Sequence, residues 1–535
     1  MKLNILVLIF IIILSAFLRL YHLDTLPPSP YWEEVALGYD AYSILQTGRD
    51  HHGQALPILA FESFGDWKPS GYFYVTVPSI ALFGLNIWAV RLPSALAGVG
   101  TVLLIYLLVK LLLQKHKQKE YIALASALIL VIMPWHILVS RVAFETNLAL
   151  FWTCLGIYFL LFALKSKKIY LLPVSVLPLI LSMYTYHSNR VVTPLLVLGL
   201  GILFVKKLWQ QKIWTVISIV LAFLFVLPII LNFSNPQLNH RLAETSVFTQ
   251  LEPILESNQA IARHGDTVWA KLLHHRFWYY AKLYLDHYFS HFNPQFLFIS
   301  GDSNIRHSVG LVGQLYWLQL PLLFLGIYYL FAKKEKNMML MLWWLVVAPV
   351  AAGATKATPH ALRALLMVIP LATLCAYGLI NFVTAIRKAM PKYILIGSLI
   401  LLVGGFAFEL GQFWYYYTTV YPIKSSQDWQ YGYKEMVQFI KEHQNEYDQI
   451  IVTRDQGRPA MYYWFYTKTD PKLVQAWENK TPKDQGEFLQ FENIYFGIKP
   501  QEQGKQLVIS STKMGKQNIL KSIVNLEGKP VFYIY

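Results

Sequence analysis

Two adjacent carboxylates, Glu33 and Glu34, stand in the stretch PPSPYWEEVALGYDAYSI, which follows the first apolar segment of the chain. A positioned carboxylate can act as a general base on a hydroxyl group. Acidic residues are also common in the first turn of a helix, where backbone N–H groups are unpaired. Because adjacent helical residues point about 100° apart, the two side chains cannot work as one bidentate group. The pair is therefore either a helix start or a base beside a residue that binds or orients.

A cation on the same segment offers complementary chemistry. Asp66 and Lys68 lie in FESFGDWKPSGYFY, and Lys68 precedes an aromatic, apolar stretch. A lysine at such a place either extends its amine from apolar surface to water or neutralises a phosphate at the depth of the lipid headgroups. The sequence leaves both interpretations open.

Further polar side chains gather between later apolar runs. Arginines on the outer side are unexpected under the positive-inside rule, which makes them functional candidates, although Arg141 and Glu145 are spaced to pair on a helix. The candidates for contact with a donor phosphate or lipid are Lys68, Arg141, Arg190, Arg306, Lys356 and Arg363. The candidates for other substrate contacts are Asp66, Tyr39, His187, Asn189, His307 and His360. The histidines and cysteines lack metal-ligand spacing, so no metal ligand is predicted.

The composition predicts a polytopic membrane protein that positions these residues. Of the 535 residues, 55% are hydrophobic and 14% are charged, and the mean hydropathy is +0.40. Soluble domains are about 25% charged. The formal net charge of +16 therefore concerns membrane topology, and no nucleic-acid partner is predicted.

Apolar runs long enough to cross a bilayer predict about eleven transmembrane helices. They are 4–20, 92–113, 121–139, 147–164, 170–187, 191–205, 213–232, 311–332, 338–353, 364–384 and 393–414. Loops rich in Lys and Arg fall on every second connection, at 110–119, 165–168, 206–212, 333–336 and 387–392. The positive-inside rule makes that side cytoplasmic, together with the N-terminus. The odd number of spans then places the C-terminus outside.

The outer side carries most of the polar mass. Its first segment, 21–91, holds the two glutamates and Lys68, and WEEVALGYDAYSILQTG is predicted as an amphipathic helix at the membrane interface. The stretch 68–85 is predicted as a second interfacial or partly inserted helix. The tail is predicted as a small α/β domain, with helices at KEMVQFIKEHQ and PAMYYWFYTKT and strands at DQIIVTRD, ENIYFG, QLVISS and KPVFYIY. The predicted domains are a transmembrane domain, 1–415, and an extracytoplasmic domain, 416–535.

Several phrases together resemble the bacterial family 39-like glycosyltransferases, which are related to protein O-mannosyltransferases and lipid A aminoarabinose transferases. They are YWEEVALGYDAY, AYSILQTGRDHHG, GDWKPSGYFY, AVRLPSALAG, PWHILVSRVAFE and PHALRAL. The resemblance covers nearly all of the membrane part and is weak over the tail. It implies the polytopic C-type glycosyltransferase fold.

The resemblance also implies an activity. Such enzymes move a sugar from a polyprenyl-phosphate donor to a lipid, glycan or protein acceptor on the outer side of the plasma membrane, usually with inversion. A carboxylate of the first outer loop is the base, and because the usual pair is Asp-Glu, Glu33 replaces the aspartate with one more methylene. In the aminoarabinose branch a lysine of a Lys-Pro step contacts the lipid phosphate, and Lys68-Pro69 matches that step.

Two other functions fit the topology: a transporter or flippase of lipid-linked saccharides, and a sugar-chain polymerase or ligase. A transporter would place charges near the bilayer midplane and contain paired broken helices, whereas the predicted spans are nearly free of charge. The sequence does not identify the donor sugar, the acceptor, the oligomeric state or a requirement for a divalent cation such as Mg²⁺ or Mn²⁺.

Overall fold

The computed structural model describes residues 2–166, 168–232, 234–235, 244–389, 391–500, 504–515 and 518–535. The chain forms two compact units. Unit 1 comprises Met1–Ser15, Gly100–Val139 and Ala149–Gly411, and unit 2 comprises Ala16–Val99, Ser140–Leu148 and Gln412–Tyr535. Residue 167 of the basic loop 165–168 and residue 390 of the loop 387–392 lie outside the described residues.

Helices make up most of the membrane part, and many of them are rich in apolar residues. Those that pass from one unit into the other are α1 (Lys2–Leu20), α4 (Ile87–Leu112), α6 (Pro134–Ser140), α7 (Glu145–Lys165) and α20 (Lys392–Tyr415). Those within unit 1 are α5 (Lys119–Ile132), η1 (Ile169–Leu171), η2 (Pro173–Ser175), α8 (Val176–Thr185), α9 (Asn189–Leu203), α10 (Val205–Gln210), α11 (Lys212–Leu231), η3 (Val247–Thr249), α13 (Glu252–Arg263), α14 (Val268–Leu273), α15 (Arg276–Ser290), η4 (Gln295–Ile299), α16 (Gln319–Lys333), η5 (Lys336–Met338), α17 (Met339–Val347), α18 (Val350–Gly353), η6 (Leu365–Met367) and α19 (Val368–Ala389).

Many of these helices are suited to cross a membrane. Within the described ranges, seven are long and apolar enough, and an eighth span results if α5 and α6, which meet at a bend of 62°, form one broken span. The predicted spans 170–187, 191–205 and 311–332 fall on shorter apolar helices. A multi-pass membrane protein is therefore confirmed, while the number of eleven spans stays a prediction.

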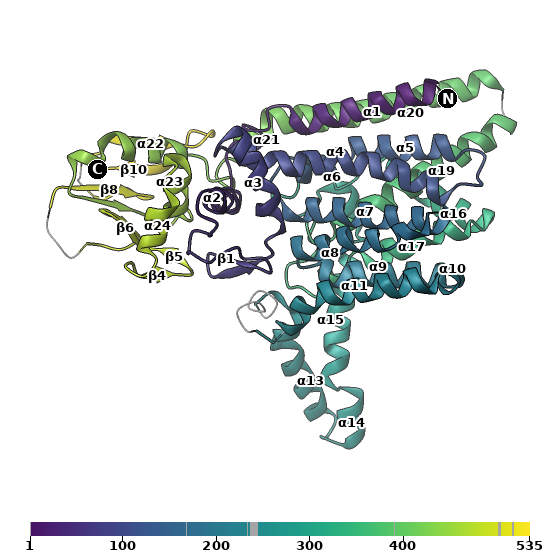
Figure 1. The fold of residues 1–535 in the computed structure, drawn as a ribbon, viewed down its shortest axis with the longest axis horizontal. Coiled ribbons are helices and arrows are strands. Elements are labelled where there is room, and N and C mark those ends of the chain that lie inside the picture. The colour runs from purple at the N-terminus through teal and green to yellow at the C-terminus, as the bar shows by residue number, and fades with distance from the viewer. Residues whose placement is uncertain are drawn as a thin grey trace. The chain divides into compact units, whose positions relative to one another are not determined.

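Helices α16 and α19 of unit 1 pack at close range (Figure 1). A Cβ atom on Gly326 of α16 would lie 2.1 Å from the carbonyl oxygen of Leu374. A Cβ atom on Gly378 of α19 would lie 2.3 Å from the carbonyl oxygen of Leu322. Small residues permit such approach of helix backbones in membranes. Helix α19 also packs against α5.

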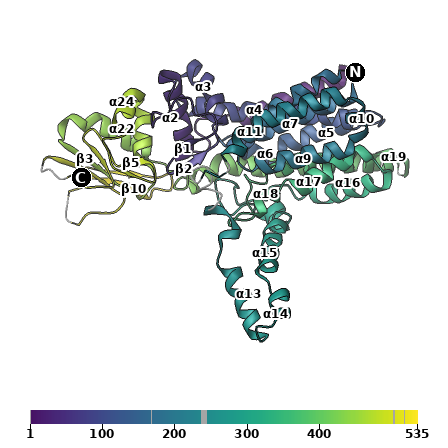
Figure 2. The ribbon, with the colours of Figure 1, turned by 60° about the horizontal axis from the view of Figure 1, so that its bottom comes forward.

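The segment 233–310, which is predicted to lie outside, contains helices of its own within its described residues, 234–235 and 244–310. Its helices α13, α14 and α15 extend as an arm away from the other helices of unit 1 (Figures 1 and 2). Helix α15 packs against α13 along the arm and against α18 at its base. After the arm, the chain forms the π-helical turn η4 and the loop that carries Arg306 and His307.

Unit 2 contains residues 21–91, the predicted first outer segment, in which one buried helix, α2 (Trp32–Thr47), packs against α3 (Gly71–Phe83). The two are joined by a hairpin of β1 (Phe61–Ser63) and β2 (Asp66–Lys68). The helix at 32–47 was predicted, but its amphipathic character, with one exposed polar face, is wrong, while its position at the membrane interface stays a prediction. Residues on all sides of α2 are buried, and a Cβ atom on Gly38 would lie 2.5 Å from Val90 Cγ2 and 2.9 Å from Phe465 Cε2.

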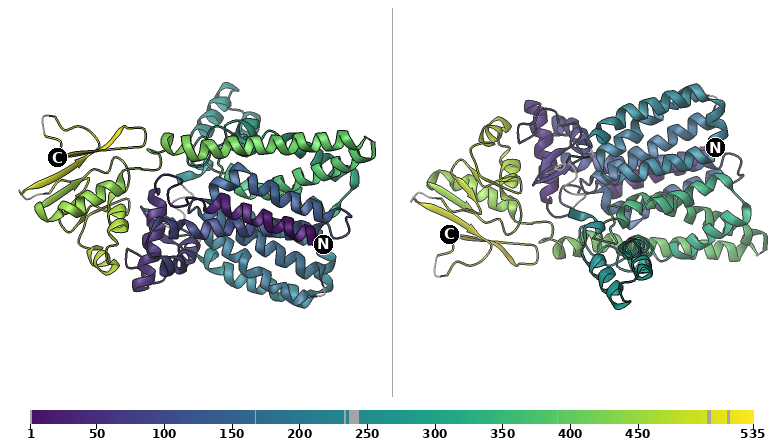
Figure 3. Two further views of the ribbon diagram at one scale, coloured as in Figure 1. Left: turned by 90° about the horizontal axis from the view of Figure 1, so that it is seen from above. Right: turned by 90° about the horizontal axis from the view of Figure 1, so that it is seen from below.

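The tail of unit 2 forms a mixed sheet with the strand order β6-β7-β3-β8-β10-β9. Central strand β3 is parallel to β7 and β8, and β10 is antiparallel to β8 and β9. The helices of the tail lie on one side of this sheet (Figure 3). The described elements are η7 (Tyr416–Val420), α21 (Tyr421–Lys424), α22 (Tyr433–His443), η8 (Gln444–Glu446), β3 (Gln449–Val452), α23 (Pro459–Thr467), α24 (Pro471–Trp477), β4 (Lys483–Asp484), β5 (Glu487–Phe488), β6 (Gln490–Phe491), β7 (Ile494–Phe496), β8 (Gln506–Ser510), β9 (Lys521–Val524) and β10 (Pro530–Ile534).

All six elements that were predicted for the tail are present, as α22, α23, β3, β7, β8 and β10. Helix α24 and the short strands β4, β5, β6 and β9 were not predicted. The tail also contacts the first outer segment, because α2 packs against α23 and α24. The division at residues 415 and 416 stays a prediction, since unit 2 combines the tail with that segment.

Candidate active site

Glu34 is held by four N–H donors inside unit 2. Its Oε1 accepts from Arg91 Nε at 2.8 Å and from the backbone N–H of Ala143 at 3.0 Å. Its Oε2 accepts from Arg91 Nη2 at 2.9 Å and from the backbone N–H of Tyr31 at 3.2 Å. The residue is 2% exposed. A buried carboxylate whose two oxygens are both occupied is poorly suited to take a proton from a substrate.

The partner of Glu34, Arg91 at the start of α4, has every N–H donor engaged. Besides the bidentate contact with Glu34, its Nη1 donates to the carbonyl oxygens of Leu23 and Pro27, both at 3.0 Å, and its Nη2 donates to that of Ser29 at 2.9 Å. Five donors in a planar fork suit this arrangement. The buried pair therefore fastens the polypeptide before α2 to the start of α4.

Glu33 differs from its neighbour in accessibility. Its side chain is 32% exposed, and its Oε1 lies 3.0 Å from Nζ of Lys68 on β2. The prolines before Trp32 direct the chain into the first turn of α2, and the antiparallel hairpin β1–β2, with Glu62 opposite Trp67, returns Lys68 to the same place. The two residues singled out for base and phosphate chemistry are thus in contact.

Lys68 is an uncommon lysine because its side chain is only 3% exposed. Apart from the ion pair with Glu33, Nζ makes no hydrogen bond to the described part of the chain. A buried ammonium group carries three N–H donors and is costly to leave without partners. This observation favours a bound anion over a lysine that extends to water.

Two other predicted residues of unit 2 serve packing. Arg141 is buried and donates to the carbonyl oxygens of Leu18 at 2.8 Å and Leu26 at 3.2 Å, to that of Tyr21, and to Tyr417 Oη at 3.1 Å. We therefore reassign Arg141 from phosphate binding to fixing the end of α1. Tyr39 is also buried, and its hydroxyl donates to the carbonyl oxygen of Thr469 in the tail at 3.0 Å. Asp66, next to the catalytic candidates on β2, is half-buried.

The other predicted residues lie in unit 1. Asn189 is buried and donates to Thr153 Oγ1 at 2.9 Å, which makes it a link between α9 and α7. Arg190 donates to the carbonyl oxygen of Met183 at 3.3 Å, and its Nη2 has no hydrogen-bond partner among the described residues. His187 and Arg306 are half-buried, and Lys356 is exposed.

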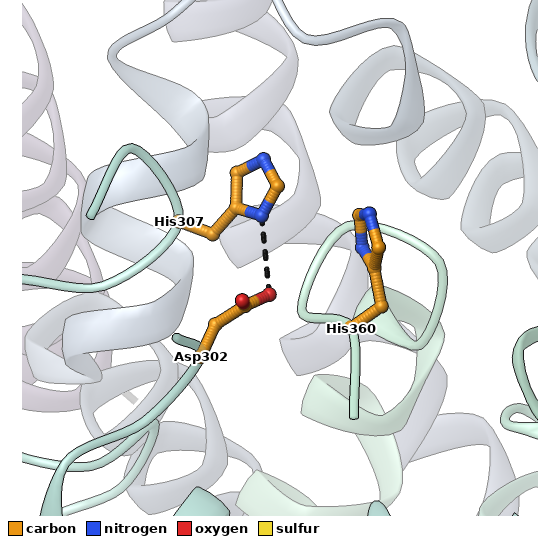
Figure 4. A group of neighbouring side chains, drawn as sticks. All are labelled: Asp302, His307 and His360. Atoms are coloured by element: carbon orange, nitrogen blue, oxygen red, sulfur yellow. Dashed lines mark hydrogen bonds and ion pairs between the residues drawn. The ribbon is translucent and has the colours of Figure 1, made fainter. Parts of the chain in front are cut away.

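Unit 1 brings Asp302, His307 and His360 together (Figure 4). His307 Nδ1 lies 3.1 Å from Asp302 Oδ2, which also accepts the backbone N–H of Ala361 at 2.7 Å. Burial would raise the pKa of Asp302, but the hydrogen bond and charge of His307 and the charge of His360 lower it to about 2. Burial, together with the charges of Arg363 and His307, holds the pKa of His360 well below its ordinary value. Arg363 donates to Thr355 Oγ1 at 2.7 Å.

Sequence reasoning missed several partners. Arg91 was visible as a charge beside a predicted span, which is a recognised sign of an important residue. Asp302 stands in the same short stretch as Arg306 and His307, yet it was not singled out. Asp40 and His51 form a buried pair with a distance of 2.7 Å, and His52 Nδ1 lies 2.8 Å from Glu478 Oε2 of the tail. Only the DHHG turn hinted at these contacts.

Part of the sequence is similar to known mannosyltransferases. Residues 68–231 match the family described as dolichyl-phosphate-mannose-protein mannosyltransferase. A Bacillus subtilis (strain 168) protein named "Putative mannosyltransferase YkcB" is 30% identical over 166 residues, which are 30% of this chain and 21% of that protein. The chain thus spans about a fifth of the length of the curated relatives it matches.

Solved structures are similar over longer stretches. ArnT from Cupriavidus metallidurans, bound to undecaprenyl phosphate, gives a TM-score of 0.53 at 10% identity. The match covers 99% of this chain and 97% of the ArnT chain. The oligosaccharyltransferase AglB from Archaeoglobus fulgidus, in complex with an inhibitory peptide and a dolichol-phosphate, gives a TM-score of 0.51 at 11% identity, with 86% and 63% covered. The chain has the C-type glycosyltransferase fold. The resemblance to family 39-like membrane glycosyltransferases is confirmed, and this C-type fold carries the Glu33–Lys68 pair on its first outer segment.

Proposed function

We propose that the protein is a membrane glycosyltransferase that moves a sugar from a polyprenyl-phosphate donor to an acceptor hydroxyl, with Glu33 as the general base and Lys68 as the ligand of the donor phosphate. The contact between an accessible carboxylate and a buried ammonium group, 3.0 Å apart, carries this proposal. Its support from relatives is the mannosyltransferase family match and the polyprenyl phosphates bound by ArnT and AglB.

The choice between the two glutamates follows from their partners. Glu34 is held by Arg91, Ala143 and Tyr31 at both oxygens, so it acts as a positioning residue. Glu33 extends from the preceding position of the same rigid turn and is accessible to an acceptor. The fixed turn reduces the freedom of the base before substrate arrives, which favours catalysis by orientation.

The proposed reaction is one displacement at the anomeric carbon. Glu33 takes the proton of the acceptor hydroxyl. At the same time, the oxygen of that hydroxyl attacks the anomeric carbon on the face opposite the phosphate. The new C–O bond forms as the bond from that carbon to the phosphate oxygen breaks. The released polyprenyl phosphate keeps the electron pair, and Lys68 stabilises its charge. Glu33 then loses the proton to water, and the sugar has inverted configuration.

The ion pair gives the donor a part in activating the base. While Lys68 contacts Glu33, the ammonium charge stabilises the carboxylate and makes it a weaker proton acceptor. A donor phosphate that contacts Lys68 neutralises this charge. The carboxylate of Glu33 therefore becomes a better base once the sugar donor is bound. The extra methylene of Glu33, relative to the aspartate that family resemblance implies, lets the carboxylate move from lysine to acceptor.

Transfer assays with purified protein test these roles. Polyprenyl-phosphate mannose is the first donor to try, because the matched family is described by mannose transfer. We expect Glu33→Gln to lower kcat by about 10²–10⁴-fold and Lys68→Met to raise the KM for donor. Glu62→Gln on the same hairpin and Lys434→Met at an exposed position of α22 are the matched controls, which should retain activity. Full activity of Glu33→Gln on every accepted donor would exclude Glu33 as the base.

We also propose that the site faces the extracytoplasmic side. The basic loops support this topology through the positive-inside rule. Cys154 and Cys375 are both buried, so a cysteine introduced by Lys117→Cys can be labelled with little background. Protection of this cysteine from an impermeant reagent in intact cells is expected. Labelling from outside would invert the topology, and movement of donor across a vesicle without release of polyprenyl phosphate would instead favour a flippase.

A further inference from the structure

We propose that Asp302, His307 and His360 form a binding site for a zinc-type divalent metal ion that joins two loops of unit 1. Each residue offers one ligand atom, and these atoms lie within 4.8 Å of one another. Within the described ranges, no other three His, Cys, Asp or Glu side chains are arranged in this way. The three come from segments that are distant in sequence, the loop after η4 and the loop before η6.

The state of the ligand atoms supports a site rather than a chance cluster. His360 Nδ1 is buried and has no hydrogen-bond partner among the described residues. An imidazole nitrogen in that position has a lone pair or an N–H that nothing in the surrounding protein satisfies. Asp302 supplies the negative charge that a dication requires, and it is 7% exposed. Figure 4 shows the ring of His307 above this carboxylate, joined to it by a dashed line, and His360 beside the two.

Outer contacts already orient the loops. The backbone N–H of Asn304 donates to Asp302 Oδ1 at 2.9 Å, and that of Ala361 donates to Oδ2 at 2.7 Å. The backbone N–H of His360 donates to His291 Nε2 at 3.1 Å. Hydrogen bonds that fix the ligands from behind are a common feature of protein metal sites. A bound ion would add a second link between the two loops, which the hydrogen bond from Ala361 to Asp302 already connects.

The donor set selects the class of ion. Two imidazole nitrogens and one carboxylate suit Zn²⁺ and related transition metals, and a fourth position remains for water. Mg²⁺ and Ca²⁺ prefer sites made of oxygen atoms alone. The ligand atoms lie within 4.8 Å of one another, so one ion could contact all three after small movements of the side chains. The inference concerns loop stability in unit 1 and is independent of the roles proposed for Glu33 and Lys68.

Metal content of the full-length protein tests the inference. The protein should be purified in detergent through a tag without histidine, stripped with a chelator, dialysed against Zn²⁺ and analysed by elemental mass spectrometry. We expect about one zinc ion per chain. His307→Ala and His360→Ala should weaken zinc binding at least about tenfold, whereas His264→Ala on the exposed end of α13 should retain it. Stoichiometric zinc in all three variants, or none in the unaltered protein, would overturn the proposal.

A second measurement covers variants that do not fold. Cobalt added to the stripped, unaltered protein should give the intense visible absorption of a four-coordinate ion with imidazole ligands, and zinc should abolish it. Absence of this signal would refute the site without the need for any variant. Zinc should also raise the apparent melting temperature of the unaltered protein and of Glu33→Gln alike. Loss of transfer in Glu33→Gln with retained zinc binding therefore distinguishes the two proposals.

Discussion

Replacing Glu34 by glutamine separates the structural role of this carboxylate from the catalytic role proposed for Glu33. The substitution keeps the shape of the side chain but removes the charge that Arg91 contacts through two N–H groups. The new amide NH₂ would also face N–H donors of Arg91 and Tyr31, so two of the four hydrogen bonds are lost. Each hydrogen bond to a charged group contributes about 1.5–3 kcal/mol. The sum agrees with the cost of breaking a buried ion pair, about 3–5 kcal/mol.

Glu33→Gln should behave in the opposite way. The Glu33 side chain is one-third exposed, so the loss of its ion pair should change the free energy of unfolding by at most about 1 kcal/mol. Its effect should fall on kcat. Thermal unfolding in detergent, followed by intrinsic fluorescence, and transfer kinetics on the same preparations measure both properties. Glu62→Gln controls for the loss of a carboxylate on this segment.

A double-mutant cycle identifies the partner. Arg91→Met alone leaves Glu34 and three backbone carbonyl groups without their donor. Combined with Glu34→Gln, it should destabilise by less than the sum of the single variants, with a coupling of about 0.5–3 kcal/mol. The reasoning is refuted if Glu34→Gln melts like the unaltered protein and loses kcat, because Glu34 would then be the base.

Three further perturbations probe the surroundings of α2. Gly38→Ala should destabilise by about 1–3 kcal/mol, because the added methyl group overlaps Val90 and Phe465; unchanged thermal stability would contradict this packing. Tyr39→Phe should cost about 0.5–1.5 kcal/mol through loss of the hydrogen bond to Thr469, measured by thermal unfolding, and an unaltered melting temperature would show the bond to be unimportant. Burial would lower the pKa of His51, but Asp40 and other nearby carboxylates raise it above its ordinary value. The ion pair of protonated His51 with Asp40 therefore adds stability that is complete below the ordinary histidine pKa and is lost as pH rises through the raised pKa of His51. Asp40→Asn should reduce the dependence of the melting temperature on pH. An unchanged pH dependence in this variant would argue against the pair.

The sequence predicted those features that depend on local pattern. Long apolar runs identified the membrane helices, and alternation with polar residues identified β3, β8 and β10. Glu33 and Lys68 were singled out because they match short motifs of the glycosyltransferases that the sequence resembles, and their roles stay predictions. Their contact depends on the β1–β2 hairpin, whose three-residue strands are too short to give a clear signal.

Features that depend on distant parts of the chain were not predictable. Helix α2 was expected at the membrane interface because four aromatic or apolar residues follow helical spacing. The structure buries its polar side as well, since α3 and α23 pack on different sides of it. Nothing near Glu34 in the sequence indicates that Arg91 and Ala143 would occupy its oxygens. The contacts of Arg141 were not predictable for the same reason, because the carbonyl groups that accept its hydrogen bonds come from the end of α1 and from the segment after it, up to Leu26.

The contacts along α2 limit how the protein can change during evolution. Its first residue, Trp32, donates its backbone N–H to Gln430, and Gln475 donates to Ser43 and Thr47 near its end. The tail is therefore structurally coupled to the segment that carries Glu33 and is not an exchangeable module. A chimera that takes its tail from a relative must take α2 as well, since otherwise Gly38 and Tyr39 would meet foreign partners. New acceptor preferences that arise in the tail should accordingly be accompanied by changes in the helix that presents Glu33.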